Sequence, residues 1–560
     1  MKRIAAMLAA SALMASSSAA RVTASPTNDG PATMGQAQAM QPIASDPVST
    51  RSGAVAGTRI EGGVRGYLGI PFAMPPVGDL RWSTPLPIAW QGVRNADRTG
   101  PECIQVLRPH NINHYFGEEP TSEDCLYLNI WAPEATPAAK LPVIVFLYGG
   151  GFTIGSSGMP HYGGAAVARR GAVFVNFNYR VGAFGFLAHP ELSREQGGHS
   201  GNYGLMDQIA ALRWIRENIA AFGGDPDKVM IIGQSAGALS VSSLIFSPGA
   251  KGLFRSATMT SWCNYHDTMP TLAEAEAIGL AVQQRLKADT LAAMRDIPAD
   301  RILAIQSESQ VGANVQGIRI GGPIVDGFVL PGQKPALLAA GQINRVPIIA
   351  SSNTDDIDIQ MSPFGHIATL DQYRTAASAA FGNDAVGFLR LFPAKGDAEA
   401  NAMARHVAHL AGFVLASRQC ARDQASIGQP AYIDEFARKH PYAPGVHFAD
   451  QDPATVGAYH TGDVPYWLGT LDAYNSRRRT REWTAYDRSL SETMMDDLIA
   501  FAREGRPGPG WPAWSAKDER ETVFGDSVAV RRLDTRRLDW LAAHPIARQA
   551  LPPRPGSPRD

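Results

Sequence analysis

The pentapeptide Gly233-Gln234-Ser235-Ala236-Gly237 places a serine between two glycines, after an apolar run and before small residues of helical character. When a strand becomes a helix within one or two residues, the turn residue is strained and its neighbours two positions away must be small. The serine hydroxyl then stands at the tip of the turn, where a histidine and a substrate can both reach it. This pattern is consistent with a nucleophilic serine and equally with an ordinary glycine-rich turn, and the rest of the chain must decide between them.

A second glycine-rich segment, YGGGFTIGSS at residues 148–157, begins where an apolar run stops. Consecutive glycines let backbone N–H groups approach a ligand without interference from a Cβ atom. In acyl transfer the carbonyl oxygen becomes negative, and losing one N–H donor aimed at it costs about 3 to 4 kcal/mol. We therefore interpret this segment as an oxyanion-binding loop rather than a flexible linker.

A serine nucleophile also needs an acid and a histidine, which follow it in the chain when it sits on a strand–turn–helix. The acidic loop SSNTDDIDIQ (351–360) and the small-residue loop VGAYHTGDVPYWLG (456–469), which contains His460, satisfy this order. Other late histidines lie in less distinctive surroundings: His366, His406 and His409.

Short apolar runs that alternate with helix-like stretches must position these groups. Four runs predict buried strands, and one amphipathic stretch predicts a helix over 205–222; the strands are 141–148, 172–179, 228–233 and 345–352. This alternation predicts an α/β fold with a large, mostly parallel central sheet and helices on both faces. Chemistry gathers at the carboxyl ends of such strands, where Ser235 and the glycine segment lie.

Composition limits the possible partners. The chain has 560 residues, 45% of them hydrophobic, and a formal net charge of −1. It can bury a large core, and it lacks the basic balance typical of nucleic-acid binding, so we expect no nucleic-acid partner. Beyond the N-terminal region no 18 residues are continuously apolar, so we expect no membrane partner for the mature protein. The oligomeric state is not predicted.

The N-terminal region begins with Lys2 and Arg3, followed by an apolar run and small residues. This order predicts a secretory signal peptide over residues 1–20, cleaved near Ala20 or Ala24. A membrane anchor is less favoured because the apolar run is short. We expect a secreted or periplasmic protein.

Composition predicts a flexible lead-in over 21–50 and a proline-rich tail over 546–560, and we expect one domain over 51–545 between them. The four cysteines are Cys103, Cys125, Cys263 and Cys420. Their even number in an exported chain favours disulfides over metal ligation, and no clustered motif predicts a metal site. The first two are close enough in sequence to close a short loop. For the second two we favour a bridge over two buried thiols.

The chain resembles the type-B carboxylesterase family of α/β-hydrolases from about residue 53 to residue 525. The motifs occur in the family's order: GYLGIPFAMPPVGDLRW (66–82), EDCLYLNIW (123–131), YGGGF (148–152), NYRVGAFGFL (178–187), GNYGLMDQIAALRWIRENIAAFGGDP (201–226), GQSAGALS (233–240), GPIVDG (322–327), VPIIASSNTDD (346–356) and GAYHTGDVPYWLG (457–469).

The resemblance implies a serine esterase that acts on small-molecule esters without a cofactor. It implies three catalytic side chains, Ser235, Asp356 and His460. It implies three oxyanion donors, the backbone N–H groups of Gly150, Gly151 and Ala236. It also implies a disulfide between Cys103 and Cys125.

The chain departs from the family's pattern at three places. The family usually carries Glu where this chain has Asp356, and the neighbouring Asp355 is a rival for the role. Gln234 replaces a common Glu, which removes a negative charge and weakens attraction for cationic esters. Trp262 and Cys263 follow Ser261 where small residues are commoner, so the indole either narrows the acyl pocket or packs in the core.

Five residues are candidates for the substrate wall, although the aromatic ones among them could equally pack in the core: Gln234, Tyr203, Trp262, Phe413 and Trp467. The run RRRTR (477–481) is most simply a solvated surface, or else a rim that attracts carboxylated esters. A lipase is disfavoured because segment 104–120 is not strongly amphipathic. An amidase and a non-catalytic binding module of the same fold are two further hypotheses.

Overall fold

The computed structural model describes residues 41–108, 110–114, 120–134, 137–310, 320–356 and 364–546. The predicted signal peptide, its cleavage positions, residues 21–40 and residues 547–560 lie outside this part of the chain. Residues 41–50 belong to the folded unit that begins at Gln41, since β1 (Val48–Ser49) pairs with β2 (Ala54–Ala56) and Ile43 is buried. The predicted flexible lead-in is therefore wrong for these ten positions.

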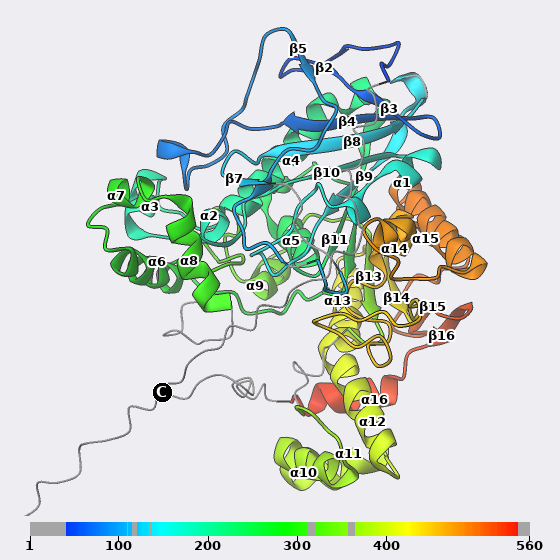
Figure 1. Cartoon of the computed structure of the whole chain (residues 1–560). Helices are drawn as coiled ribbons and strands as arrows, with labels where there is room; N and C mark the ends of the chain where they lie inside the picture. Colours follow the sequence, from blue (N-terminus) through cyan, green and yellow to red (C-terminus); the bar gives the residue numbers. More distant parts are fainter. Residues whose placement is uncertain are drawn as a thin grey trace, which may run out of the picture. The chain divides into compact units, whose positions relative to one another are not determined.

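Within the described residues, eleven strands form one sheet (Figure 1). In spatial order they are β16 (Val528–Arg532), β15 (Arg520–Phe524), β14 (Ala431–Phe436), β13 (Ile348–Asn353), β12 (Ser256–Thr260), β11 (Gly224–Gln234), β9 (Leu141–Leu147), β10 (Val173–Phe177), β8 (Tyr127–Pro133), β4 (Val64–Pro71) and β3 (Thr58–Ile60).

The strands from β15 to β10 run parallel to one another, and the outer strands are antiparallel to their neighbours. Every residue of β10, β12 and β13 is buried. This burial is typical of parallel strands covered by helices on both faces. The four predicted strands are confirmed as β9, β10, β11 and β13.

Helices cover the sheet on both faces. Figure 1 shows α1 (Ala165–Arg169), α14 (Val464–Leu468) and α15 (Ala485–Glu504) on one side, and α4 (Tyr203–Asn218) and α5 (Ala236–Phe246) on the other. The predicted helix 205–222 is confirmed as α4, which continues as a 3₁₀ turn over Ile219–Phe222.

The remaining elements surround this core. The other helices are α2 (Gly182–Phe186), α3 (Pro190–Glu195), α6 (Leu272–Leu286), α7 (Leu291–Arg295), α8 (Ala299–Gln310), α9 (Lys334–Ala339), α10 (Leu370–Phe381), α11 (Ala385–Leu391), α12 (Asp397–His409), α13 (Leu415–Ser426) and α16 (Thr535–Ala543). Short pairings join β2 to β5 (Val93–Asn95) and β6 (Glu102–Cys103) to β7 (Thr121–Ser122).

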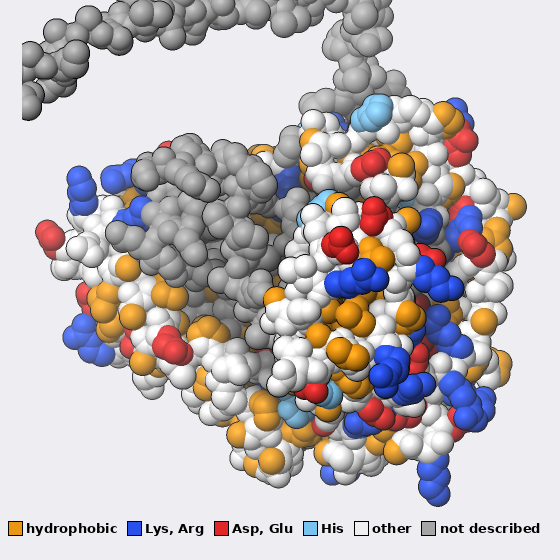
Figure 2. Space-filling view, turned by 90° about the horizontal axis from the view of Figure 1, so that it is seen from below, with side chains coloured by type: hydrophobic (Ala, Val, Ile, Leu, Met, Phe, Trp, Pro, Cys, Tyr) orange, Lys and Arg blue, Asp and Glu red, His pale blue; other side chains and the backbone are white. Residues whose placement is uncertain are grey.

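Among the helices of the described residues, none is both long and apolar enough to cross a bilayer. On the face that Figure 2 shows, side chains of both charges are interspersed with hydrophobic ones. This mixture agrees with the formal net charge of −1.

Candidate active site

Ser235 stands where β11 becomes α5, with a backbone φ of 56° and ψ of −120°. A Cβ atom added at Gly237 would overlap the carbonyl oxygen of Leu147, and one at Gly233 would overlap that of Gly237. The two glycines therefore let the strand, the turn and the helix pass one another, as the pentapeptide predicted. The Ser235 N–H donates to the Thr260 carbonyl at 2.9 Å, which anchors the turn to β12.

The glycine loop after β9 lies against this turn. A Cβ atom on Gly149 would come within 3.0 Å of the Ser235 Cβ. Gly150 and Gly151 have φ values of 108° and 63°, which L side chains rarely adopt. The N–H groups of Gly150, Gly151 and Ala236 donate no hydrogen bond to any described residue. All three donors are thus available to a ligand oxygen beside Ser235.

Asp356 follows β13 and is fully buried. One carboxylate oxygen lies 2.6 Å from His460 Nδ1, and the other accepts the Asn353 N–H at 2.8 Å. A buried carboxylate on Nδ1 makes that nitrogen the donor and leaves Nε2 free to accept a proton. Asp356 therefore contacts the imidazole directly, although its side chain is shorter than the glutamate that the family usually has at this position.

Asp355, the rival acid, faces a different way. Its carboxylate forms an ion pair with Arg405 and accepts the Ala458 N–H at 3.0 Å. The two adjacent acids therefore have separate partners, and only Asp356 contacts His460. Two of the other late histidines, His406 and His409, lie on α12. The imidazole of His409 lies 3.1 Å from the Glu435 carboxylate.

His460 contacts both Asp356 and Gln234, the residue before Ser235. Burial disfavours its charged form, but the hydrogen bond and charge of Asp356, helped by Asp463, outweigh burial and raise the pKa of His460. Its Nε2 lies 3.2 Å from Nε2 of Gln234, whose side chain is buried. Gln234 is therefore a neighbour of the imidazole as well as of the serine.

Two residues missing from the sequence-based site hold this arrangement. The Asn353 side chain donates to the Tyr459 carbonyl at 2.7 Å and to Asp463 at 3.1 Å. Burial, together with the charge of Asp356, raises the pKa of Asp463 to about 6. The polar Asn353 at the end of an apolar strand was a signal available in the sequence, whereas Asp463 had none beyond its distance of three residues from His460.

The five candidates for the substrate wall divide into two groups. Phe413, in a π-helical turn between α12 and α13, has its ring 6.5 Å from the His460 ring and 6.0 Å from the Trp262 ring. The Trp262 indole N–H donates to Asp267 at 2.9 Å, so it is both anchored and beside the site. Phe413 and Gln234 therefore lie next to His460, and Trp262 lies next to Phe413.

Tyr203 and Trp467 lie in the core instead. Tyr203 is 0% exposed, and its hydroxyl accepts from Gln196 at 2.9 Å while Arg180 covers its ring. Trp467 is 1% exposed and packs edge-on against Phe524. Neither side chain has surface to offer a substrate, so core packing describes both of them correctly.

The four cysteines form two disulfides, Cys103–Cys125 and Cys263–Cys420. The second joins the segment after β12 to α13 across 157 positions of sequence. In the described part of the chain, no group of three or more His, Cys, Asp or Glu side chains could hold a metal ion.

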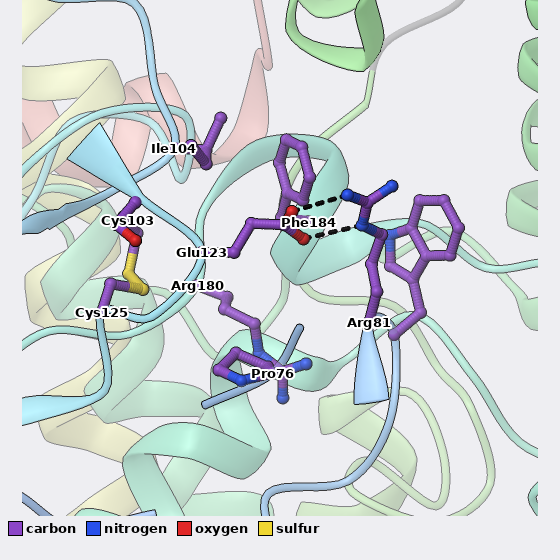
Figure 3. Close-up of a pocket in the computed structure, with 10 residues that line it drawn as sticks. Pro76, Arg81, Cys103, Ile104, Glu123, Cys125, Arg180 and Phe184 are labelled. Carbon is purple, nitrogen blue, oxygen red and sulfur yellow. Dashed lines mark hydrogen bonds and ion pairs between the residues drawn. A yellow bond between two sulfur atoms is a disulfide. The ribbon is translucent and has the colours of Figure 1, made fainter. Parts of the chain in front are cut away.

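A recess beside the first disulfide is lined by Arg81, Glu123 and Arg180 (Figure 3). Arg81 makes two hydrogen bonds to Glu123, at 2.7 and 2.6 Å, and Arg180 makes two to Asp207, at 2.9 and 2.8 Å. Both guanidinium groups are neutralised within the protein. The charged residues of this recess therefore pair with one another or with Asp207, and none of the predicted catalytic residues lines it.

The fold is that of an α/β-hydrolase. Its sheet is parallel at the centre, a serine with positive φ lies at a strand–helix turn, and an aspartate–histidine pair lies in loops that follow neighbouring strands. Residues 44–526 match the model of the carboxylesterase family. The chain is 37% identical to a fumonisin B1 esterase from Sphingopyxis macrogoltabida, over 86% of each chain. It is 32% identical to a para-nitrobenzyl esterase from Bacillus subtilis, over 86% of this chain and 94% of the other.

Among solved structures, a carboxylesterase from Geobacillus stearothermophilus has a TM-score of 0.71 and 29% identity, covering 89% of this chain and 99% of the other. The protein belongs to the carboxylesterase family, and it is a carboxylic ester hydrolase.

Proposed function

We propose that the protein hydrolyses small carboxylic esters through an acyl-enzyme on Ser235. The Ser235 hydroxyl attacks the ester carbonyl, and His460 Nε2 accepts its proton and later returns it to the leaving alcohol. Water then attacks the acyl-enzyme by the same route. The observation that carries the proposal is the 2.6 Å contact between Asp356 and His460 Nδ1 beside the serine turn.

Asp356 has two roles in this scheme. Its hydrogen bond holds the proton on Nδ1, so that Nε2 is the basic nitrogen, and its charge stabilises the imidazolium that forms during attack. The raised pKa of His460 fits the second role. Because Gln234 lies on Nε2 in this structure, the imidazole must exchange that neighbour for the Ser235 hydroxyl when the ester binds.

The N–H groups of Gly150, Gly151 and Ala236 stabilise the negative charge that develops on the carbonyl oxygen. These donors lack an acceptor among the described residues and flank Ser235. Preformed donors of this kind lower the barrier because they need no reorganisation during the reaction. Phe413 and Trp262 supply an apolar wall beside the imidazole.

We further propose that residues 1–20 are a signal peptide and that the mature enzyme, with its catalytic domain over 51–545, is secreted or periplasmic. Two disulfides support an oxidising compartment. N-terminal sequencing of the exported protein tests this proposal, which expects a start near Arg21 or Ser25 and fails if export leaves Met1 in place.

Replacing the nucleophile tests the catalytic proposal. Ser235→Ala should lower kcat for 4-nitrophenyl butyrate by roughly 10⁴-fold or more, because no neighbouring group replaces the hydroxyl. Circular dichroism of the variant should match that of the wild type. If a well-folded Ser235→Ala protein retained a tenth of the wild-type activity, another nucleophile would be at work.

A further inference from the structure

The arginine-rich run near the site does not lie wholly in solvent. Arg478 and Arg479 are exposed, but Arg481 is 2% exposed. Its guanidinium lies between two aromatic rings, 4.4 Å from the centroid of Tyr474 and 5.0 Å from that of Tyr442. The prediction of a solvated surface is therefore wrong for Arg481, because these rings enclose its side chain.

The hydrogen-bond partners of Arg481 are neutral. It donates to the side-chain oxygen and, at 3.1 Å, to the backbone carbonyl of Asn113. It also donates to the Tyr459 hydroxyl at 3.2 Å, to Thr480 Oγ1 at 2.9 Å and to His440 Nδ1 at 3.4 Å.

Of the four other buried arginines among the described residues, three each meet a carboxylate: Arg81, Arg180 and Arg418. The fourth, Arg65, donates to the backbone carbonyls of Pro133 and Phe222.

No carboxylate of a described residue forms an ion pair with Arg481, although burying a cation without an opposite charge is costly. Aromatic faces recover part of that cost. An anion that the protein itself does not supply would recover more.

Arg481 lies on the wall of a recess whose other polar lining groups are also donors or neutral. They include Arg478, His110, His161 and Asn113, and among the described residues no aspartate or glutamate lines this recess. His161 is 4% exposed, and its Nε2 has no hydrogen-bond partner within the described part of the chain. Burial and the charge of Arg481 lower the pKa of His161 to about 3, so its imidazole is neutral and can donate one N–H.

The recess adjoins the catalytic histidine. Tyr459, whose hydroxyl accepts a hydrogen bond from Arg481, directly precedes His460 in the chain. The His114 ring stacks on the Tyr459 ring, with their centroids 6.5 Å apart. The pKa of His114 is lowered by burial and by the positive charges of its neighbours, which include both His460 and Arg481. His114 and Tyr459 thus lie between the recess and the catalytic base.

We propose that this recess binds the ionised carboxylate of the substrate, so that the enzyme selects esters that carry a free carboxylate over their neutral counterparts. The proposal rests on the proposed esterase function and assigns its substrate class. Arg481 contributes its charge, because most of its N–H groups already donate to neutral acceptors of the protein. The exposed Arg478 guanidinium and the His161 imidazole, which also line the recess, can donate hydrogen bonds to the carboxylate. Because the described lining residues include no acid, no repulsion from them opposes binding.

Two matched substrate pairs test this selection. Mono-4-nitrophenyl adipate is compared with methyl 4-nitrophenyl adipate, and 3-(butanoyloxy)benzoate with its methyl ester, so that the carboxylate lies on the acyl side or on the alcohol side. The wild type should prefer the anionic member of at least one pair by about tenfold in kcat/KM at low salt, and the preference should fall as salt rises.

Variants within one run of sequence supply the control. Arg478→Gln removes an exposed charge that lines the recess, and Arg481→Lys keeps the charge but loses the planar donor set. Both should reduce the preference by several-fold. Arg479→Gln removes an equal charge from an exposed residue that pairs with Glu482 and does not line the recess, so its ratio should stay at the wild-type value.

Competition with free anions completes the test. Citrate should inhibit the wild type competitively and Arg478→Gln more weakly, whereas inorganic phosphate should compete less well. Equal rates for both members of each pair, or an unchanged ratio in both Arg478→Gln and Arg481→Lys, would overturn the proposal. Inhibition by phosphate without any carboxylate preference would also overturn it. Failure of the esterase function itself is distinguishable, because neutral esters would then not be hydrolysed either.

Discussion

The two sides of the proposed catalytic site are held in place by different means. On the side of the proposed nucleophile, Ser235 is positioned by backbone packing, because a Cβ atom at Gly233 or Gly237 would overlap neighbouring backbone atoms. On the base side, His460 is positioned by side chains: Asp356 holds its Nδ1, and Asn353 holds the preceding carbonyl. The position of Ser235 therefore depends on the small size of the two glycines, whereas the position of His460 depends on the charge and the hydrogen bonds of its neighbours.

This difference also separates two adjacent acids on the base side. Asp356 is buried against the imidazole, whereas Asp355 pairs with Arg405 and a backbone N–H. Neighbours in sequence thus serve separate networks, and substitution of each should have a separate consequence.

The largest effect is expected for the acid that contacts the histidine. Asp356→Asn should lower kcat by about 10³- to 10⁴-fold, because an amide no longer holds the proton on Nδ1 or stabilises the imidazolium. Asp355→Asn keeps the same size and should lower kcat less than about tenfold, since Arg405 and Ala458 lie outside the proton path. Steady-state kinetics on one neutral ester compare the two. The reverse ranking would assign the catalytic role to Asp355.

An intermediate effect is expected at Asp463, where folding raises the pKa of a buried carboxyl to about 6. Its protonated form is favoured in the folded protein, so this contribution to stability is present below its ordinary pKa near 4 and is lost as pH rises to 6. Asp463→Asn should therefore increase stability at pH 7 by up to about 3 kcal/mol relative to the wild type. It should also lower the pKa of His460, because one negative charge is removed.

Urea unfolding at pH 4 and at pH 7 measures the effect of Asp463→Asn, and the pH–rate profile measures His460. Wild type and variant should converge at pH 4. A variant that loses stability equally at both values would show instead that the carboxylate is needed for its hydrogen bond with Asn353.

The smallest effect concerns Gln234, which directly precedes Ser235 in the chain and whose side chain contacts His460. Gln234→Glu would place a negative charge about 3 Å from His460 Nε2 and should raise the acidic limb of the kcat/KM profile by about one pH unit. Gln234→Met is the neutral control and should leave that limb within a few tenths of a unit.

Gln234→Glu should also favour a choline ester over its neutral 3,3-dimethylbutyl analogue, whereas the wild type should turn the two over equally. A tenfold preference for the choline ester in the wild type would contradict this reasoning. The aromatic face of Trp262 would then be the first cation-binding group to test.

The sequence predicted the backbone-held side well, and the reason is physical. Strand runs, the glycine loop and the serine turn depend on residues within a few positions of one another, so their patterns are local. Asn353, Asp463 and Arg481 depend instead on loops that meet only in the folded chain. For Tyr203 and Trp467 the sequence left two alternatives open for the same reason, because an aromatic residue near a motif can face either the site or the core.

The most direct test of the central claim is covalent labelling of the nucleophile. A 4-nitrophenyl alkylphosphonate resembles the tetrahedral intermediate and should inactivate the wild type in proportion to its incorporation. Peptide mass spectrometry should then find one phosphonyl group, on Ser235, and none on the Ser235→Ala protein. Inactivation with the adduct on any other residue, or equal labelling of the Ser235→Ala protein, would contradict the account.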